Sequence, residues 1–175
     1  SRGDQSEPEP FCFNEMVSKS VSYAQQSARD GAAGGGLLGV LQDLAPQAGD
    51  FVGYPYDLAR VVINVVDNAF HAVAARQGEA EKNYAPQVTI SSAVVEGNVQ
   101  LTIEDNGIGI KAADLSLVFD PYYTKKSVDE GTGLGLAISH DIVVNQHKGT
   151  IEVTSEPRTF TRVRIKLPQR GGDGS

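Results

Sequence analysis

The feature that most restricts the fold is a long glycine-rich stretch between a predicted strand and a predicted helix. Residues 106–132 are irregular apart from one helical patch around 112–118. A loop of more than about twenty residues is uncommon inside a compact domain and is usually functional. The chain is therefore expected to fold around a long loop that serves its activity.

Hydrophobic periodicity predicts a small set of helices and strands around this loop. Strands that are segregated from a few helices favour an α+β fold, a two-layer sandwich. We expect a core over residues 11–168, a flexible lead-in over 1–10 and a flexible tail over 169–175. The predicted helices cover 14–30, 55–77 and 133–147, and the predicted strands cover 37–44, 88–95, 99–105, 150–155 and 161–167.

Composition excludes several classes of protein. The 15 basic and 22 acidic residues give a net charge of −7, so a large basic footprint for nucleic acid is absent and no nucleic-acid partner is expected. A phosphate-bearing ligand must then be held by local features that work against the net field. The single cysteine excludes an internal disulfide framework and a multi-cysteine zinc site. No apolar run approaches the roughly 20 residues of a membrane span.

The predicted helix over 55–77 carries a polar stripe. An α-helix turns about 100° per residue, and the polar side chains recur within about 60° of Asn64. A solvated surface is the ordinary explanation, but this stripe lacks Lys and Glu and places two Asn residues, which are poor helix formers, one turn apart. An Asn carbonyl can coordinate a hard cation and its NH2 can donate to phosphate, so a surface and a functional site both stay open. The stripe contains Asp57, Arg60, Asn64, Asp67, Asn68 and His71, and the apolar side contains Leu58, Val62, Val65, Val66, Ala69 and Val73.

Each glycine cluster also has two interpretations. The segment 105–110, DNGIGI, ends a predicted strand, where Asn-Gly commonly makes a turn. Its carboxylate and spaced glycines also suit a planar ligand with an exocyclic amine, such as adenine. The segment 131–136, GTGLGL, leads into a helix and is either a hinge loop or a phosphate cradle. It has neither P-loop nor Rossmann spacing. The aromatic residues and lysine pair of 119–126 indicate an anchored loop or a lid that closes on phosphate.

Five segments occur in a characteristic order: NVVDNAFHA (64–72), DNGIGI (105–110), FDPYYTKK (119–126), GTGLGLAIS (131–139) and TFTRVRIKLP (159–168). They resemble the N box, first glycine box, F box, second glycine box and final strand of the catalytic ATP-binding domain of sensor histidine kinases. Gyrase, the ninety-kilodalton heat-shock chaperone and MutL belong to the same superfamily. The resemblance covers about residues 11–168. It implies a Bergerat-type fold, with a mixed sheet, helices on one face and a mobile ATP lid.

The resemblance also implies roles for matching residues. Asn68 would ligate the Mg²⁺ that bridges the phosphates of ATP, and Asn64 would help hold the phosphates or metal-bound water. Asp105 would accept a hydrogen bond from the adenine amine, while Gly107 and Gly109 let the base approach.

The lid would be formed by the F box and the second glycine box. Its Lys126 would act on the phosphates as a catalytic cation together with the two Asn residues, and Gly133 and Gly135 would cradle phosphate. Three departures from the family stand out: a His at position 71 in place of Lys or Arg, Tyr where Phe is frequent, and no Gly near 156–158. The remaining expected nucleotide contacts are His71, Tyr123, Thr124, Gly131, Thr132, Leu134 and Leu136.

Position 64 bears on the reaction. ATP-hydrolysing relatives carry a Glu there that activates water, whereas Asn64 cannot act as a base. A neutral imidazole needs less activation than water, so this position favours a histidine as phosphoryl acceptor. Asp67 is a carboxylate on the same stripe and could in principle serve as a base. An ATPase that works as a conformational clamp, and a nucleotide-binding module without transfer, are the alternatives.

The acceptor histidine of this family lies on a dimerisation hairpin that precedes the catalytic domain. None of His71, His140 and His147 has such a context. We therefore expect an excised catalytic domain that binds ATP and ADP, with the hairpin upstream in the natural protein and a response regulator receiver domain as a further partner. The resemblance places such a domain in the cytoplasm, whether or not the full protein is anchored in a membrane.

Overall fold

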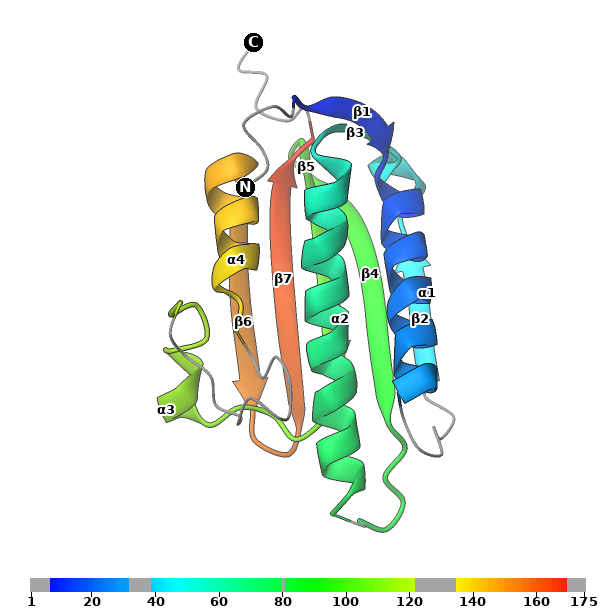
Figure 1. The fold of residues 1–175 in the computed structure, drawn as a ribbon, viewed down its shortest axis with the longest axis vertical. Helices are drawn as coiled ribbons and strands as arrows, with labels where there is room; N and C mark the ends of the chain where they lie inside the picture. The colour runs from blue at the N-terminus through cyan, green and yellow to red at the C-terminus, as the bar shows by residue number, and fades with distance from the viewer. Residues whose placement is uncertain (1–6, 32–38, 80, 122–134, 170–175) are drawn as a thin grey trace.

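The computed structural model describes residues 7–31, 39–79, 81–121 and 135–169. Its centre is a five-stranded sheet in the order β2-β4-β5-β7-β6 (Figure 1). β2 runs parallel to β4, and every other neighbouring pair is antiparallel, so the sheet is mixed. The strands are β2 (Gly39–Leu44), β4 (Gln87–Val95), β5 (Asn98–Asp105), β7 (Phe160–Pro168) and β6 (Thr150–Glu156).

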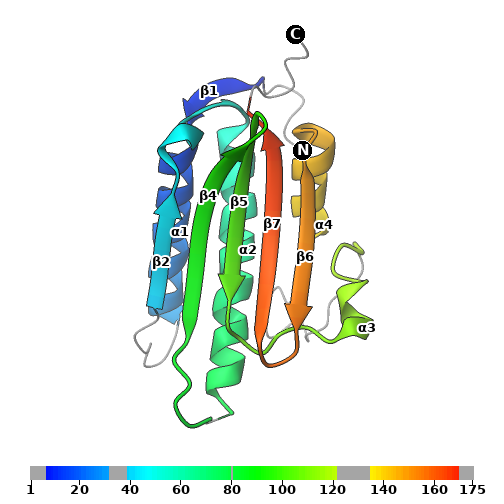
Figure 2. The same ribbon diagram turned by 180° about the vertical axis from the view of Figure 1, so that it is seen from behind.

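The longer helices cover one face of this sheet. Figure 2 shows the opposite face open, with the helices behind the strands. The arrangement confirms the predicted α+β sandwich of two layers with a mixed sheet and helices on one side. The helical elements are α1 (Phe13–Gly31), η2 (Pro46–Ala48), α2 (Pro55–Gln77), α3 (Ala112–Leu115), α4 (Ala137–His140) and η4 (Asp141–Gln146).

The sheet and α2 enclose the core because their apolar periodicities match. Along β5 the burial alternates strictly, with Val99, Leu101 and Ile103 buried against the helices, as expected when successive side chains point to opposite faces. The predicted apolar side of α2 is entirely buried. Each such side chain contributes roughly 1.5–3 kcal/mol when it leaves water, so this packing fixes the rotation of α2 and hence the direction of its polar stripe.

Two short strands were not predicted. β1 (Glu9–Cys12) and β3 (Asp50–Gly53) form a separate antiparallel pair. Four residues are too few to show a periodicity of two, which explains why the pattern missed them. The Phe51 ring of β3 lies 5.3 Å from that of Phe13 and 5.5 Å from that of Phe11. The strands β1 and β3 therefore pair where these three aromatic rings pack together.

The predicted helix over 133–147 is divided in the structure. Its described part is α4 followed by η4, a π-helical turn that ends where His147 N–H donates to Ile142 O at 3.1 Å. The buried His147 ring then joins η4 to the start of α2. Its Nδ1 donates to Ile142 O at 2.9 Å, and its Nε2 accepts from Tyr54 N–H at 3.1 Å. This neutral form suits a site where burial lowers the pKa of His147.

One helix in the described part of the chain is long and apolar enough to cross a membrane, by length and composition alone. It is α2, and 44% of its most apolar window is buried inside the protein. The core helix of a globular domain passes the same test, and the burial of one side of α2 against the sheet accounts for its composition.

Candidate functional site

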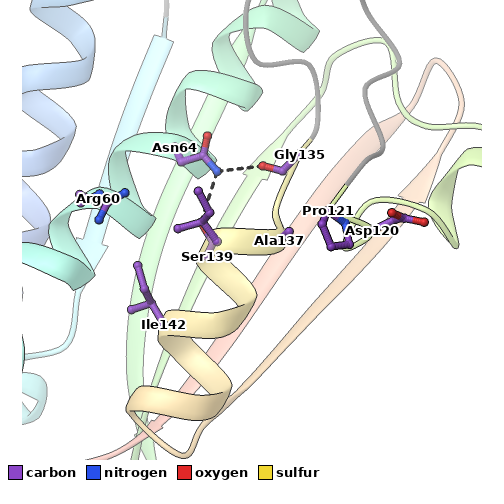
Figure 3. A pocket seen from close by; sticks show the side chains of 9 residues that line it. Arg60, Asn64, Asp120, Pro121, Gly135, Ala137, Ser139 and Ile142 are labelled. Atoms are coloured by element: carbon purple, nitrogen blue, oxygen red, sulfur yellow. Dashed lines mark hydrogen bonds between the residues drawn. The ribbon is translucent and has the colours of Figure 1, made fainter. Parts of the chain in front are cut away.

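The polar stripe of α2 faces α4 and η4 near its N-terminal end. Asn64 Nδ2 donates to Ser139 Oγ at 3.2 Å and to Gly135 O at 3.3 Å, which joins α2 to the beginning of α4 (Figure 3). About two helical turns before Asn64, Asp57 Oδ2 accepts from Gln146 Nε2 of η4 at 3.0 Å. This part of the stripe is therefore a boundary between helices, which favours the functional interpretation over a solvated surface.

A cavity of about 400 Å³ opens at this boundary (Figure 3). The amide oxygen of Asn64 points away from α4, because both hydrogen bonds of that side chain use its nitrogen. Leu136, between the lining residues Gly135 and Ala137, is itself buried, and its N–H donates to Val118 O at 2.9 Å. The lining residues are Arg60, Asn64, Asp120, Pro121, Gly135, Ala137, Ile138, Ser139 and Ile142.

Further along the stripe the burial varies. Asn68 is buried, with 7% of its surface exposed, whereas His71 is exposed and its Nδ1 bonds to the backbone oxygen of Asp67 at 2.8 Å. Burial raises the pKa of the Asp67 carboxyl, and the nearby His71 partly opposes this shift. The stripe therefore offers a buried amide and a half-buried carboxyl within one helical turn.

The second part of the site lies at the end of β5. Asp105 is 5% exposed, and its Oδ1 accepts from Gly107 N–H at 2.8 Å. Burial raises the pKa of Asp105 to about 7, although the Gly107 hydrogen bond lowers it. A buried polar group is costly unless it is paired. Because Gly107 fixes Oδ1, the other carboxylate oxygen can accept a hydrogen bond from an amine of a ligand.

The glycines after Asp105 are required by the packing of the chain itself. A Cβ atom on Gly107 would lie 2.7 Å from the Cβ of Ala72 and would also overlap the backbone of α2. Ile108 N–H donates to Ala72 O at 3.0 Å across the same contact. Gly109 has a φ of +77°, and a Cβ there would lie 2.7 Å from Pro157 Cα. These glycines are expected from the sequence to let a ligand come close to the backbone. In this structure, the segments that come close to them are α2 and the β6–β7 turn.

The structure brings together the expected residues from three distant segments: Asn64 and Asn68 of α2, Asp105 with its glycines, and Gly135 with Leu136. Sequence reasoning gave no role to Ser139, which is 3% exposed and holds Asn64. Its place in the GTGLGLAIS segment was the only available sign. Several expected contacts lie outside the described residues, and with them most of the expected ATP lid: Tyr123, Thr124, Lys126, Gly131, Thr132, Gly133 and Leu134.

Comparison with known proteins gives a consistent result. Residues 53–171 match the family model for histidine kinase-, DNA gyrase B- and HSP90-like ATPases. The sensor histidine kinase ZraS of Klebsiella oxytoca is 32% identical over 162 residues, which are 91% of this chain and 31% of that protein. The catalytic domain of the histidine kinase ThkA has a TM-score of 0.76 at 20% identity, over 95% of this chain and 98% of that one. ThkA in complex with the response regulator protein TrrA gives 0.70 at 17% identity, over 95% and 43%.

The chain therefore belongs to the family of histidine kinase-, DNA gyrase B- and HSP90-like ATPases, whose model matches more than half of it. Its fold is that of a histidine kinase catalytic domain. Together with the similarity to the sensor histidine kinase ZraS over 91% of the chain, this identifies the chain as an ATP-binding domain of the histidine kinase type. The chain spans less than a third of the length of ZraS.

Proposed function

We propose that this domain binds Mg²⁺–ATP between α2, the end of β5 and the start of α4. In the full-length protein it would transfer the γ-phosphoryl group to a histidine on an upstream dimerisation hairpin. The observation that carries the proposal is the side chain at position 64. An amide there is held by Ser139 and Gly135 and points its oxygen away from α4, at the place where hydrolytic relatives carry a water-activating carboxylate.

Base recognition is assigned to Asp105. Its carboxylate is buried and oriented by the Gly107 N–H. When ionised it accepts hydrogen bonds only, so it complements the donating amine of adenine and repels a carbonyl at the same position. In a buried site this selection is strong, because a mismatched ligand leaves a polar group unpaired.

The residues present fit a bound Mg²⁺. The described residues contain no group of three or more His, Cys, Asp and Glu side chains that could hold a metal by themselves. Two amide oxygens one turn apart are hard ligands of the kind that Mg²⁺ takes alongside substrate phosphates. Asn68 would be the ligand, and Asn64 would hold phosphate or metal-bound water. The ion, when bound, would neutralise the developing charge on the phosphates.

Phosphoryl transfer to histidine requires positioning more than proton removal. The imidazole nitrogen forms the new P–N bond as the bond from the γ-phosphorus to the β,γ-bridging oxygen breaks, and ADP leaves. A neutral imidazole already carries a lone pair, so no carboxylate base is needed at position 64. Lys126, Gly133 and Gly135 would hold the phosphates during this step.

Partners and location follow from the same proposal. ThkA has been solved with a response regulator protein, and we propose that the full-length form of this protein likewise passes its phosphoryl group to a receiver domain. The aspartate phosphate formed there would be the signalling output. The catalytic domain would act in the cytoplasm, where ATP is available.

Calorimetric titration with a non-hydrolysable ATP analogue, with and without Mg²⁺, tests the binding site. We expect saturable binding that Mg²⁺ strengthens, and loss of the Mg²⁺ effect in Asn68→Ala but not in Asn145→Ala, a control at an exposed amide. Absence of binding by the folded wild-type domain would overturn the site. In the full-length protein, labelled ATP should leave an acid-labile, base-stable phosphate, as expected for phosphohistidine.

A second function is favoured by one observation. Asp67 is half-buried on the same stripe, and burial raises the pKa of its carboxyl toward the range of a general base. An ATPase of the clamp type would use it to activate water. Steady hydrolysis that Asp67→Asn abolishes would support this function, whereas negligible turnover by the wild-type domain would exclude it.

A further inference from the structure

A chain of charged side chains joins the end of α2, the α2–β4 connection and the β6–β7 turn. Both carboxylate oxygens of Glu81 accept from Arg76, whose Nε and Nη2 lie at 2.9 and 3.1 Å. The oxygen bonded to Arg76 Nε also accepts from Arg158 Nη2 at 3.1 Å. Glu79 pairs with Arg158 as well. Glu81 therefore bridges two guanidinium groups that are more than seventy positions apart in the sequence.

Both ends of this bridge support the loop that follows Asp105. Arg76 Nη1 donates to the backbone oxygen of Asn106 at 3.0 Å. The backbone N–H of Arg158 donates to Ile108 O at 2.5 Å. Asn106 and Ile108 flank Gly107, whose N–H orients the carboxylate of Asp105. These two bonds thus hold the peptide group that carries the Gly107 N–H and the carbonyl group of Ile108 that follows it.

Tyr84 reinforces one end of the bridge. Its hydroxyl donates to the same Asn106 backbone oxygen at 3.0 Å, and the Arg76 guanidinium lies 4.6 Å from the centre of its ring. The side chains of Arg76 and Glu81 are only 17% and 27% exposed. An ion pair that is partly shielded from water is screened less than one on the open surface.

The other end of the bridge explains a departure from the family pattern. Arg158 has a φ of +59°, a conformation that glycine adopts freely and other residues rarely adopt. It lies at the end of the stretch 156–158, near which the family resemblance implies a glycine that this sequence lacks. This chain keeps a side chain at that position, and the side chain reaches Glu79 and Glu81.

We propose that Glu81 is a positioning residue for base recognition, which sets the 106–110 loop through Arg76 on one side and Arg158 on the other. The inference rests on the proposed role of Asp105 in reading adenine. It predicts that losing the bridge weakens the preference for an amino-purine, because the loop no longer holds the carboxylate in one orientation. Binding through the phosphates is unaffected, since those contacts are assigned to α2 and to the segment that precedes α4.

The test compares ATP with inosine triphosphate, which carries a carbonyl where adenine carries its amine. Inhibition constants are measured by displacement of a fluorescent ATP analogue from the wild-type domain, Glu81→Gln and Glu15→Gln. The last is the matched control, because Glu15 is an exposed carboxylate on α1 that pairs only with Lys19 at 4.0 Å among the ion pairs described. We expect Glu81→Gln to reduce the ATP preference about fivefold, and Glu15→Gln to leave it unchanged.

A second variant separates the side chain of Arg158 from its backbone. Arg158→Gly keeps the N–H that donates to Ile108 and suits the positive φ, so its melting temperature should stay the same or rise. Its preference for ATP should nevertheless fall as in Glu81→Gln. A lower ATP preference in a variant whose melting temperature is unchanged or higher cannot result from partial unfolding.

The outcomes are distinct. A changed ATP preference in both variants, with no further loss when either is combined with Asp105→Asn, supports the inference. An unchanged preference in Glu81→Gln, or an equal weakening of both nucleotides, overturns it while the proposed function stands. A wild-type domain that does not distinguish the two nucleotides overturns the role of Asp105 and, with it, this inference.

Discussion

Two regions of the candidate site are built in different ways. The β5 loop, residues 105–110, is fixed largely through backbone groups, with the Gly107 N–H on Asp105 and the Ile108 N–H on Ala72. The α2–α4 boundary, where Asn64 meets Gly135 and Ser139, is joined by longer side-chain hydrogen bonds beside a cavity of about 400 Å³. The β5 loop, which is assigned to the adenine amine, is therefore held mainly by backbone hydrogen bonds. The α2–α4 boundary, which is assigned to the phosphates, is held by side chains that can change conformation.

Asp105→Asn gives the largest expected effect. The Asn oxygen would accept from Gly107 N–H, as Asp105 Oδ1 does, and would turn its NH2 toward the adenine amine, so that two donors face each other. We expect ATP affinity to fall by about 100-fold or more, measured by calorimetry.

The stability of this variant should move in the opposite direction. The folded-state pKa of Asp105 is about 7, above its ordinary value of 3.8. The stability linked to this group is therefore present below about pH 4 and lost as the pH rises through about 7. Asp105→Asn has no such loss and should be more stable at pH 8. A variant that loses both affinity and stability would contradict the assigned role.

Gly109→Ala tests whether the β5 loop owes its order to backbone packing. Gly109 and Gly97 have nearly the same φ, +77° and +80°, but only the former is crowded; a Cβ on Gly97 meets nothing within 4 Å. Alanine should cost about 1 kcal/mol at either position for the backbone conformation, and about 2 kcal/mol more at Gly109 for the overlap. Urea unfolding measures the difference, and equal costs would show that the β6–β7 turn yields easily.

The pH dependence of binding gives a smaller effect on the same region. Only the ionised Asp105 accepts the adenine amine through its second oxygen. With a pKa of about 7, the ionised fraction, and hence the apparent ATP affinity, should rise about tenfold from pH 6 to pH 8. Calorimetry across this range checks the slope, which should disappear in Asp105→Asn. A slope that persists in the variant would assign it to another group, such as Asp67.

Ser139→Ala gives the smallest effect and tests the α2–α4 boundary. It removes one acceptor of the Asn64 amide and lets that side chain rotate. The loss of about 1 kcal/mol for one hydrogen bond corresponds to about fivefold weaker Mg²⁺–nucleotide binding. Ser116→Ala, at an exposed hydroxyl, is the control. If metal-free binding falls by the same factor, Ser139 supports the fold and does not orient Asn64.

Most of the regular structure was predictable because its periodicity is long. The 23 residues of α2 and the eight or nine residues of β4, β5 and β7 repeat their apolar positions several times. The short strands β1 and β3 and the π-helical turn η4 have no such repeat, and they form where Phe51 and His147 find partners far away in the sequence. The candidate site was predictable to the level of its segments, since each box is local.

The sequence by itself determined which face of α2 is polar and which segments form the candidate site, because periodicity and turn chemistry depend on neighbouring residues. Only the tertiary structure decided what holds those residues in place. The need for Gly107 arises from Ala72, the orientation of Asn64 from Ser139, and the support of the β5 loop from Glu81 and Arg158. These partners are distant along the chain. The stability that they contribute arises only when the two segments pack together, so neither segment alone shows a sequence pattern that predicts the contact.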